Sequence, residues 1–302
     1  MEWNSRFLLL SLSWQGARIS AETFDQLKHL APDTLQEALL EKDDKRLTRV
    51  IQQNNNWQAS AEKQLQWLVK NKVEVCYRDD LEYPKKFFQL DHPPLGFTYW
   101  GECCWRDLLG LSVVGSRNPH AWSVNWLQQE LAQVLRQKSL VIISGGARGI
   151  DQSAHAVALK NQVPTIGFLP SGIANIYPSS FVSWVDAIVA GGGAVISQFS
   201  PFAPMYKGQF HARNRLIAAL CDYLIVAEAR LRSGSLLTAK LALDMGKPIG
   251  VVPCSPMMPS GRGGLDLIYD GADMLRDHRD VIDKLCDTYG LKSKLAEFSL
   301  VP

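Results

Sequence analysis

Short apolar runs rich in β-branched residues alternate with longer amphipathic segments over most of the chain after residue 108. Each run has the length and continuous hydrophobicity of a strand that is buried on both faces, and each intervening segment is long enough for a helix. The expected strands span residues 111–114, 140–144, 164–169, 193–197, 223–228 and 248–252. The expected helices span residues 120–138, 149–161, 179–190, 211–221, 234–246 and 263–270.

This alternation predicts the fold class. Strands separated by helices form βαβ units with right-handed crossovers, so the strands lie mostly parallel and helices cover both faces of the sheet. The sequence therefore predicts an α/β, Rossmann-like, doubly wound domain. Because ligands of such folds bind at the carboxyl ends of the strands, the turns that follow the strands are the candidate site.

The first part of the chain has a different pattern. Leucine and phenylalanine recur at helical spacing up to about residue 72, with Asp33 as an expected N-cap and a further helix from Ser60 to Lys72. The run 73–77 indicates a strand that docks onto the second domain, and Pro93-Pro94 indicates a linker. We therefore expect a helical domain and linker over residues 1–93, the Rossmann-like domain over residues 94–290, and a tail over residues 291–302.

Composition and charge limit which kinds of partner, namely nucleic acid, membrane or metal, the chain is expected to bind. Hydrophobic residues make up 46% and charged residues 21% of 302 residues, and the formal net charge is only +2, so a nucleic-acid partner would need cations gathered locally. No apolar run approaches the roughly 20 residues of a membrane span, and the start lacks a signal-peptide pattern, so we expect no membrane partner. The six cysteines lack C-x-x-C spacing. That pattern favours buried, reduced thiols in a cytoplasmic protein over a metal site.

Three small-residue turns follow the expected strands at 111–114, 140–144 and 164–169. They are, in order, Gly115-Ser116-Arg117, Gly145-Gly146-Ala147-Arg148-Gly149 and Pro170-Ser171-Gly172. Such turns direct the free N–H groups of a helix start into one crevice, which suits phosphate. The second turn departs from the dinucleotide fingerprint and no P-loop motif is present, so we expect no NAD, ATP or other cofactor. The alternative is that the glycines serve only tight packing, but Arg148 inside the turn favours an anion.

A basic segment precedes and enters the helix expected at 211–221. Within residues 207–215 it carries three cations, an aromatic ring and an amide side chain: Lys207, Phe210, Arg213, Asn214 and Arg215. Cations near a helix N-terminus oppose the helix dipole, and an anionic ligand would remove that conflict. A solvated charged face is the alternative. Phe210 is either a stacking surface for a base or part of the core.

The strand at 223–228 leads into another helix start, capped by Ser233 or Ser235. Glu228 and Asp151 are the acids expected near the crevice, but they do not form an evident pair of general acid and base. His155 has no obvious nucleophile beside it, and a packed helix histidine is the better interpretation. The sequence therefore predicts no catalytic residue.

These motifs resemble those of the DprA (Smf) family of DNA-processing proteins. The matching segments, in chain order, are Gly115-Ser116-Arg117, 144–151 with Ala154-His155, 172–178, 210–215, 233–239 and Gly271-Ala272-Asp273. The resemblance implies a SAM-like helical N-terminal domain and an extended Rossmann-like domain that forms a homodimer. It also implies that the protein binds and protects single-stranded DNA and loads the RecA recombinase during natural transformation. By the same resemblance, Arg117 and Lys207 contact DNA and the Leu243 region lies at a two-fold interface.

The chain departs from the family pattern at three positions: His211 stands where proline is frequent, Gln198 where glutamate is frequent, and Ser179 where lysine is frequent. The last change removes an expected phosphate contact. Many members carry a C-terminal winged-helix-like domain, which was either removed from this chain or is absent from this member.

Two functions remain open. One is a non-catalytic single-strand binder, and the other is a nucleotide-binding or nucleotide-hydrolysing enzyme of the Rossmann-like phosphoribohydrolase type. Those enzymes carry an acid soon after the glycine turn, whereas the helix that starts near Ser235 has none before Asp244. This difference favours the binder.

Overall fold

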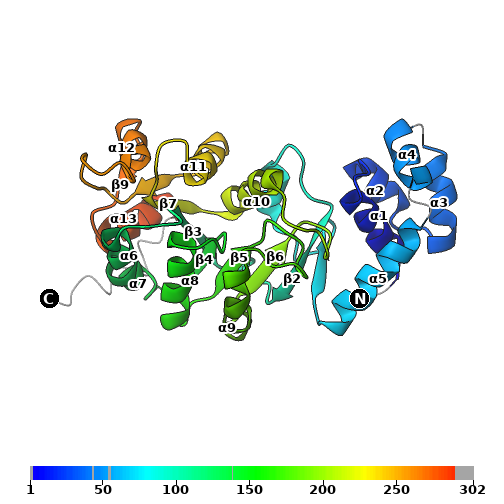
Figure 1. The fold of residues 1–302 in the computed structure, drawn as a ribbon, viewed down its shortest axis with the longest axis horizontal. Coiled ribbons are helices and arrows are strands. Elements are labelled where there is room, and N and C mark those ends of the chain that lie inside the picture. Colours follow the sequence, from blue (N-terminus) through cyan, green and yellow to red (C-terminus); the bar gives the residue numbers. More distant parts are fainter. Residues whose placement is uncertain (1–2, 43, 54–55, 138, 290–302) are drawn as a thin grey trace.

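The computed structural model describes residues 3–42, 44–53, 56–137 and 139–289, and a mixed sheet runs through the larger part of the molecule (Figure 1). Its order is β1-β2-β6-β5-β4-β3-β7-β8-β9. The strands span Glu74–Tyr77 (β1), Gly96–Gly101 (β2), Leu109–Gly115 (β3), Leu140–Ser144 (β4), Thr165–Phe168 (β5), Ala194–Ser197 (β6), Tyr223–Glu228 (β7), Ile249–Val251 (β8) and Asp273–Met274 (β9). Only β2 runs against its neighbours, and all other pairings are parallel. The predicted α/β fold with a mostly parallel sheet is confirmed.

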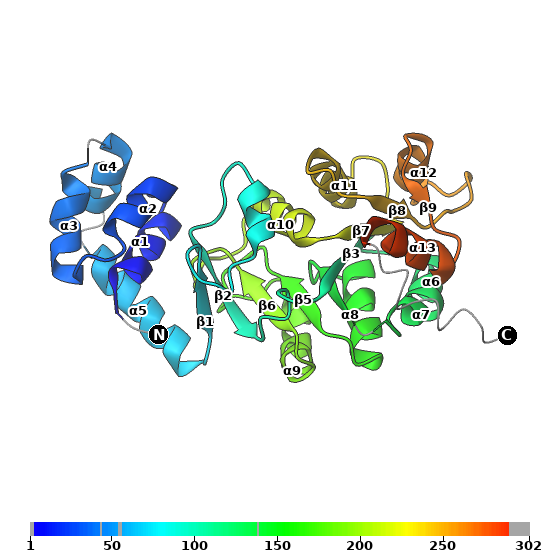
Figure 2. The ribbon, with the colours of Figure 1, turned by 180° about the vertical axis from the view of Figure 1, so that it is seen from behind.

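Helices cover both faces of this sheet (Figures 1 and 2). One face carries the 3₁₀ helix η1 (Lys85–Gln89) and the helices α10 (Lys207–Leu220), α11 (Gly234–Asp244) and α12 (Arg262–Tyr269). The other carries α6 (Ala121–Trp126), the π-helical turn η2 (Leu127–Leu131), α7 (Ala132–Val134), α8 (Ile150–Lys160), η3 (Ser179–Trp184), α9 (Val185–Ala190) and α13 (His278–Tyr289). The sheet is therefore doubly wound.

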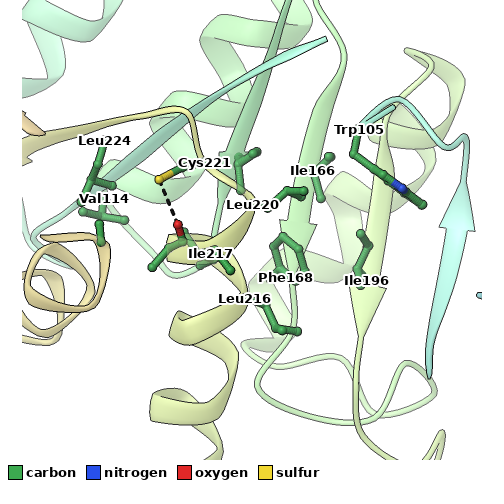
Figure 3. Close-up of a cluster of buried hydrophobic side chains, with 14 of the residues drawn as sticks. Trp105, Val114, Ile166, Phe168, Ile196, Leu216, Ile217, Leu220, Cys221 and Leu224 are labelled. Atoms are coloured by element: carbon green, nitrogen blue, oxygen red, sulfur yellow. Dashed lines mark hydrogen bonds between the residues drawn. The ribbon is translucent and has the colours of Figure 1, made fainter. Parts of the chain in front are cut away.

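The continuous apolar runs have a direct structural cause. Neighbours along a strand point to opposite faces, so Val113 packs under α6 and α8 while Val114 packs under α10 and α11. Figure 3 shows the second of these clusters, in which Leu216 and Ile217 of α10 lie over the sheet. Each fully buried aliphatic side chain contributes about 1.5–3 kcal/mol, so both faces select apolar residues at every position.

Five helices form the N-terminal module at one end of the molecule (Figure 2). They are α1 (Ser5–Trp14), α2 (Ala21–Leu27), α3 (Pro32–Leu40), α4 (Lys45–Gln53) and α5 (Trp57–Lys70). Their shared core continues into the loop after β5 through Leu169 and Ile173. The chain then passes from α5 into β1, the edge strand of the sheet, as the run at 73–77 predicted. Among the described residues, no helix has the length and hydrophobicity to cross a bilayer.

Several predicted boundaries were wrong. Helix α3 is capped by Ala31 with Pro32 in its first turn, so Asp33 lies inside the helix. Helix α5 begins at Trp57 rather than Ser60, and α10 begins at Lys207, four residues before the predicted start. The segment predicted as one helix over 120–138 is interrupted by the π-helical turn.

Other elements were missed. Strand β2, strand β9 and helix α13 were not predicted, and the segment 179–190 starts as a 3₁₀ helix. The turn after β5 is not followed by an immediate helix, because η3 begins only at Ser179. That turn therefore presents no helix N-terminus to the crevice.

Candidate nucleic-acid interface

The order of the strands reverses at β3. The chain proceeds outward through β4, β5 and β6, and then returns to place β7 on the other side of β3. The segments after β3 and β7 lead to helices on opposite faces, and in such folds a crevice lies at the carboxyl ends of these strands. A cavity of about 310 Å³ lies there, lined by the end of β3 and the turn after it (residues 114–118), by Ala147 and Asp151, by α10, and by five residues after β7, namely Arg230, Ser233, Gly234, Ser235 and Thr238.

Hydrogen bonds between the turns fix the shape of this cavity. The Ser235 hydroxyl donates to the Gly115 carbonyl (2.9 Å), and the Ile150 N–H donates to the Ser116 carbonyl (3.1 Å). Gly149 has φ +85°, and a side chain there would overlap the carbonyls of Ser116 and Arg117. Ser233 is the cap of α11 because its hydroxyl accepts the Leu236 N–H. The sequence left the choice between Ser233 and Ser235 open, and the two serines have different roles.

Arg213 and Asp151 lie side by side in the wall of the cavity. Both pack against Gly145, where a Cβ would overlap Arg213 Nη1, so only glycine leaves room for the guanidinium. Arg213 is 4% exposed, and its buried Nε has no hydrogen-bond partner in the described part of the chain. The Asp151 carboxylate instead accepts the Ala147 N–H at 3.3 Å. The cavity wall thus holds a buried cation, which suits an anionic ligand.

Burial controls the charges of this pair. Desolvation raises the pKa of Asp151 to about 6, although the Arg213 guanidinium and the turn N–H groups act in the opposite direction. Desolvation lowers the pKa of Arg213 to about 10, with Asp151 opposing the change. Arg213 therefore stays charged at neutral pH, whereas Asp151 titrates close to it.

An aromatic and cationic ridge borders the cavity. The Arg117 guanidinium is exposed and lies 5.0 Å from the centroid of the Phe210 ring, and the Arg213 guanidinium lies 5.9 Å from it. The Tyr177 ring meets Phe210 edge to face, with centroids 6.0 Å apart. Phe210 is half-buried and lies outside the core clusters, so it is accessible as a stacking surface.

The other predicted residues have different positions. Asn214 and Ser116 line the cavity, whereas exposed Arg148 lines a second cavity beside it. Lys207 is exposed in the first turn of α10, and Arg215 projects from the side of α10 opposite to Arg213, because two residues turn a helix by about 200°.

Asn118, Tyr177 and Arg230 also line the two cavities, although they were not among the predicted site residues. Asn118 and Arg230 directly follow the predicted glycine turn and the end of β7, so their positions were a usable signal.

The remaining candidates serve the structure. Glu228 accepts the His120 N–H (2.9 Å) and the Ser123 hydroxyl (2.8 Å), so it braces the start of α6. His155 is fully buried, with Nδ1 2.7 Å from the Thr165 hydroxyl, as expected for a packed helix histidine.

None of the six cysteines, which all lie in the described part of the chain, forms a disulfide. Cys76, Cys221 and Cys286 are buried, whereas Cys103, Cys104 and Cys254 are only half-buried, so the expectation of six buried thiols was wrong for three of them. Within the described ranges, no three His, Cys, Asp or Glu side chains are grouped to hold a metal ion.

A doubly wound sheet with a cation-lined crevice at its switch point defines a Rossmann-like protein built to receive anionic groups. The model of the family described as DNA recombination-mediator protein A matches residues 74–286, and the chain therefore belongs to that family.

Curated relatives agree with this assignment. Protein Smf of Escherichia coli (strain K12) is 31% identical over 226 residues, which cover 75% of this chain and 60% of the relative. Protein Smf of Synechocystis is 32% identical, covering 68% of this chain and 52% of the relative. DNA processing protein DprA of Streptococcus pneumoniae is 35% identical, and the match covers 66% of this chain and 70% of the relative. The chain thus spans only about half to three fifths of the two Smf proteins.

Solved structures share the architecture. The X-ray structure of DprA from Streptococcus pneumoniae matches with a TM-score of 0.78 at 26% identity, covering 94% of this chain and 98% of that one. The structure of DNA processing protein A from Helicobacter pylori matches with a TM-score of 0.64 at 30% identity, and the match covers 72% of this chain and 97% of that one. That structure concerns the single-stranded DNA binding mode of the Helicobacter pylori protein.

Proposed function

We propose that this protein binds single-stranded DNA in the crevice between β3 and β7, protects the incoming strand, and loads the RecA recombinase onto it. The setting is recombination during natural transformation, in the cytoplasm. The observation that carries this proposal is Arg213, a buried guanidinium in the cavity wall, beside the exposed Arg117. The Helicobacter pylori relative, whose structure concerns single-stranded DNA, supports the choice of ligand.

The shape of the site favours a single strand over a duplex. Its cations lie in and around a recessed cavity, and the whole chain carries a net charge of only +2. A flexible single strand bends its backbone into such a recess, whereas a duplex of fixed width stays outside it. We assign phosphate contacts to Arg117, Lys207 and Arg213, and the turns at 115–117 and 145–148 with Asn214, Ser233 and Ser235 complete the site, whereas Arg215 lies outside it.

We further propose that the protein is a homodimer and that each chain consists of a helical domain and a binding domain. Leu243 on α11 is 51% exposed, and Leu237 on the same helix is 37% exposed, which is costly unless a partner covers them. A two-fold interface at Leu243 would cover that side chain. The helical domain over 1–93 and the binding domain over 94–290 are the proposed units, and residues 291–302 lie outside the described part of the chain.

We propose a binding role rather than catalysis. Asp151 is the one acid among the described residues that line the cavity, and its carboxylate is engaged with the Ala147 N–H. Hydrolysis of a nucleotide would need a second group for general acid or base work.

Fluorescence anisotropy with labelled oligonucleotides of one sequence, as single strand and as duplex, tests the proposal. The single strand should bind more tightly, and Arg213→Ala should weaken it, whereas Arg279→Ala, which removes an exposed arginine paired with Asp277, should not. Equal binding of duplex, or release of ribose phosphate from AMP in a parallel assay, would overturn the proposed role. RecA filament formation on the bound strand tests the loading step separately.

A further inference from the structure

A second cavity of about 250 Å³ lies beside the first, on the other side of the ridge formed by Arg117 and Phe210. The two cavities share both of these residues, but their chemistry differs. The first is rich in hydroxyl groups and turn N–H groups, whereas the second adds Tyr177, Pro170 and Pro178. The second cavity therefore combines an aromatic and apolar surface with the guanidinium groups of Arg117, Arg148 and Arg213.

We propose that the second cavity is a nucleobase subsite, in which one base of the bound strand stacks against Tyr177 while the adjoining phosphate occupies the first cavity. The proposal rests on the single-strand binding proposed above. Its volume lies just below the roughly 300–1,000 Å³ of pockets for drug-sized ligands, which suits a single base.

The Tyr177 ring is placed to receive a base. It is 37% exposed although it lies in the rim of a cavity, and it meets Phe210 at an interplanar angle of 83°. This perpendicular arrangement uses the edge of one ring, so ring surface remains open to the cavity. An exposed aromatic face beside cations is a stacking platform for nucleic-acid bases.

The loop that carries Tyr177 is held in position before any ligand arrives. The N–H groups of Gly172 and Ala174 donate to the carbonyls of Ala203 and Pro201, both at 2.9 Å, and the Asn175 amide donates to the Phe202 carbonyl at 2.6 Å. Because the loop is already ordered, stacking on Tyr177 carries little additional ordering cost.

The ridge explains why one nucleotide would occupy both cavities. Arg117 lies over the Phe210 ring and lines both cavities, so its guanidinium can contact a phosphate on one side while Phe210 and Tyr177 face the base on the other. Stacking is available to every base, so this subsite accepts DNA without selecting a sequence.

The test compares an oligothymidine single strand with an abasic strand of the same length, by anisotropy over a series of salt concentrations. The normal protein should bind oligothymidine at least about fivefold more tightly. Tyr177→Ala should remove most of that preference and leave the slope of log K against log salt unchanged, because no phosphate contact is lost. Tyr177→Phe should retain the preference, and Tyr269→Ala, which removes a 92% exposed tyrosine on α12, should behave as the normal protein.

The outcomes separate this subsite from the proposed function. If the normal protein binds neither strand, single-strand binding itself fails. If it binds oligothymidine but Tyr177→Ala keeps the full preference over the abasic strand, or changes the salt slope, the base subsite is wrong while single-strand binding stands. A thermal melt of Tyr177→Ala that matches the normal protein excludes misfolding as the cause of a loss.

Discussion

The substitution Asp151→Asn tests whether the buried acid in the cavity wall is held at an energetic cost. The ordinary pKa of 3.8 rises to about 6 in the folded protein, chiefly because burial penalises the charged carboxylate. Between these values the unfolded chain loses its proton while the folded chain keeps it. Stability is thus greatest below about pH 4, falls as the pH rises towards 6, and stays low above it.

The size of the effect follows from the two pKa values. Their difference corresponds to about 3 kcal/mol of stability that the folded protein lacks at neutral pH. Asparagine retains an oxygen that accepts the Ala147 N–H but carries no charge. The variant should therefore be more stable than the normal protein by up to about 3 kcal/mol at pH 7.5, and by only about 1 kcal/mol at pH 4.5.

Urea unfolding at a series of pH values measures this difference. The same proton affects ligand binding, because a phosphate beside Asp151 raises its pKa further and draws a proton from solution. Single-strand affinity should rise as the pH falls from 7.5 to 5.5, and Asp151→Asn should abolish that rise.

Other groups near Asp151 do not share this behaviour. Arg213 keeps its charge over the range, and burial lowers the pKa of His155 to about 3, so that histidine stays neutral. His211→Gln is the control for the exposed histidine on α10. A stability difference that is independent of pH, or a variant less stable at every pH, would refute the reasoning.

Three further predictions use the same assays. Arg117→Ala should flatten the slope of log K against log salt by about 0.7, from a total of roughly −1.4 to −3, and Arg117→Lys should restore most of it; an unchanged slope in the alanine variant would remove Arg117 from the site. Leu243→Arg should give a monomer by sedimentation velocity that still binds single strands weakly, and an unchanged dimer would place the interface elsewhere. Gly145→Ala should lower both the melting temperature and the affinity, because its Cβ overlaps Arg213 Nη1; normal binding would show that Arg213 has room to move.

The sequence predicted the central strands well because their cause is local. Strands β4 and β7 match the predicted ranges at both ends, since a strand buried on both faces requires an unbroken apolar run and ends where that run ends. Strand β9 has only two residues, which is too short for any periodic signal. Strand β2 carries an aromatic run flanked by glycines, and its role depends on pairing with β1 and β6, far away in sequence.

The position of the cations depends on tertiary contacts. Arg213 and Arg215 look equivalent in the sequence, yet one is 4% exposed in the cavity wall and the other projects from the opposite side of α10. The phase of the helix against the sheet decides which one faces the crevice, and that phase is set by Leu216 and Ile217 in the core. Gly145 is required by the same arrangement, because Arg213 Nη1 occupies the space that a Cβ at Gly145 would fill. The sequence alone does not show that contact.

The N-terminal helices reach the binding site through the loop between β6 and α10. The Trp14 indole donates to the Gln198 carbonyl at 3.0 Å, and the Trp67 ring packs edge to face on Phe202 at 5.8 Å. The same loop is hydrogen-bonded to the loop that carries Tyr177, and it ends at the capping box of α10, ahead of Phe210. Contacts from α1 and α5 therefore restrain both aromatic walls of the site, although neither helix lines it. The helical module therefore supports the two loops that border the proposed binding site.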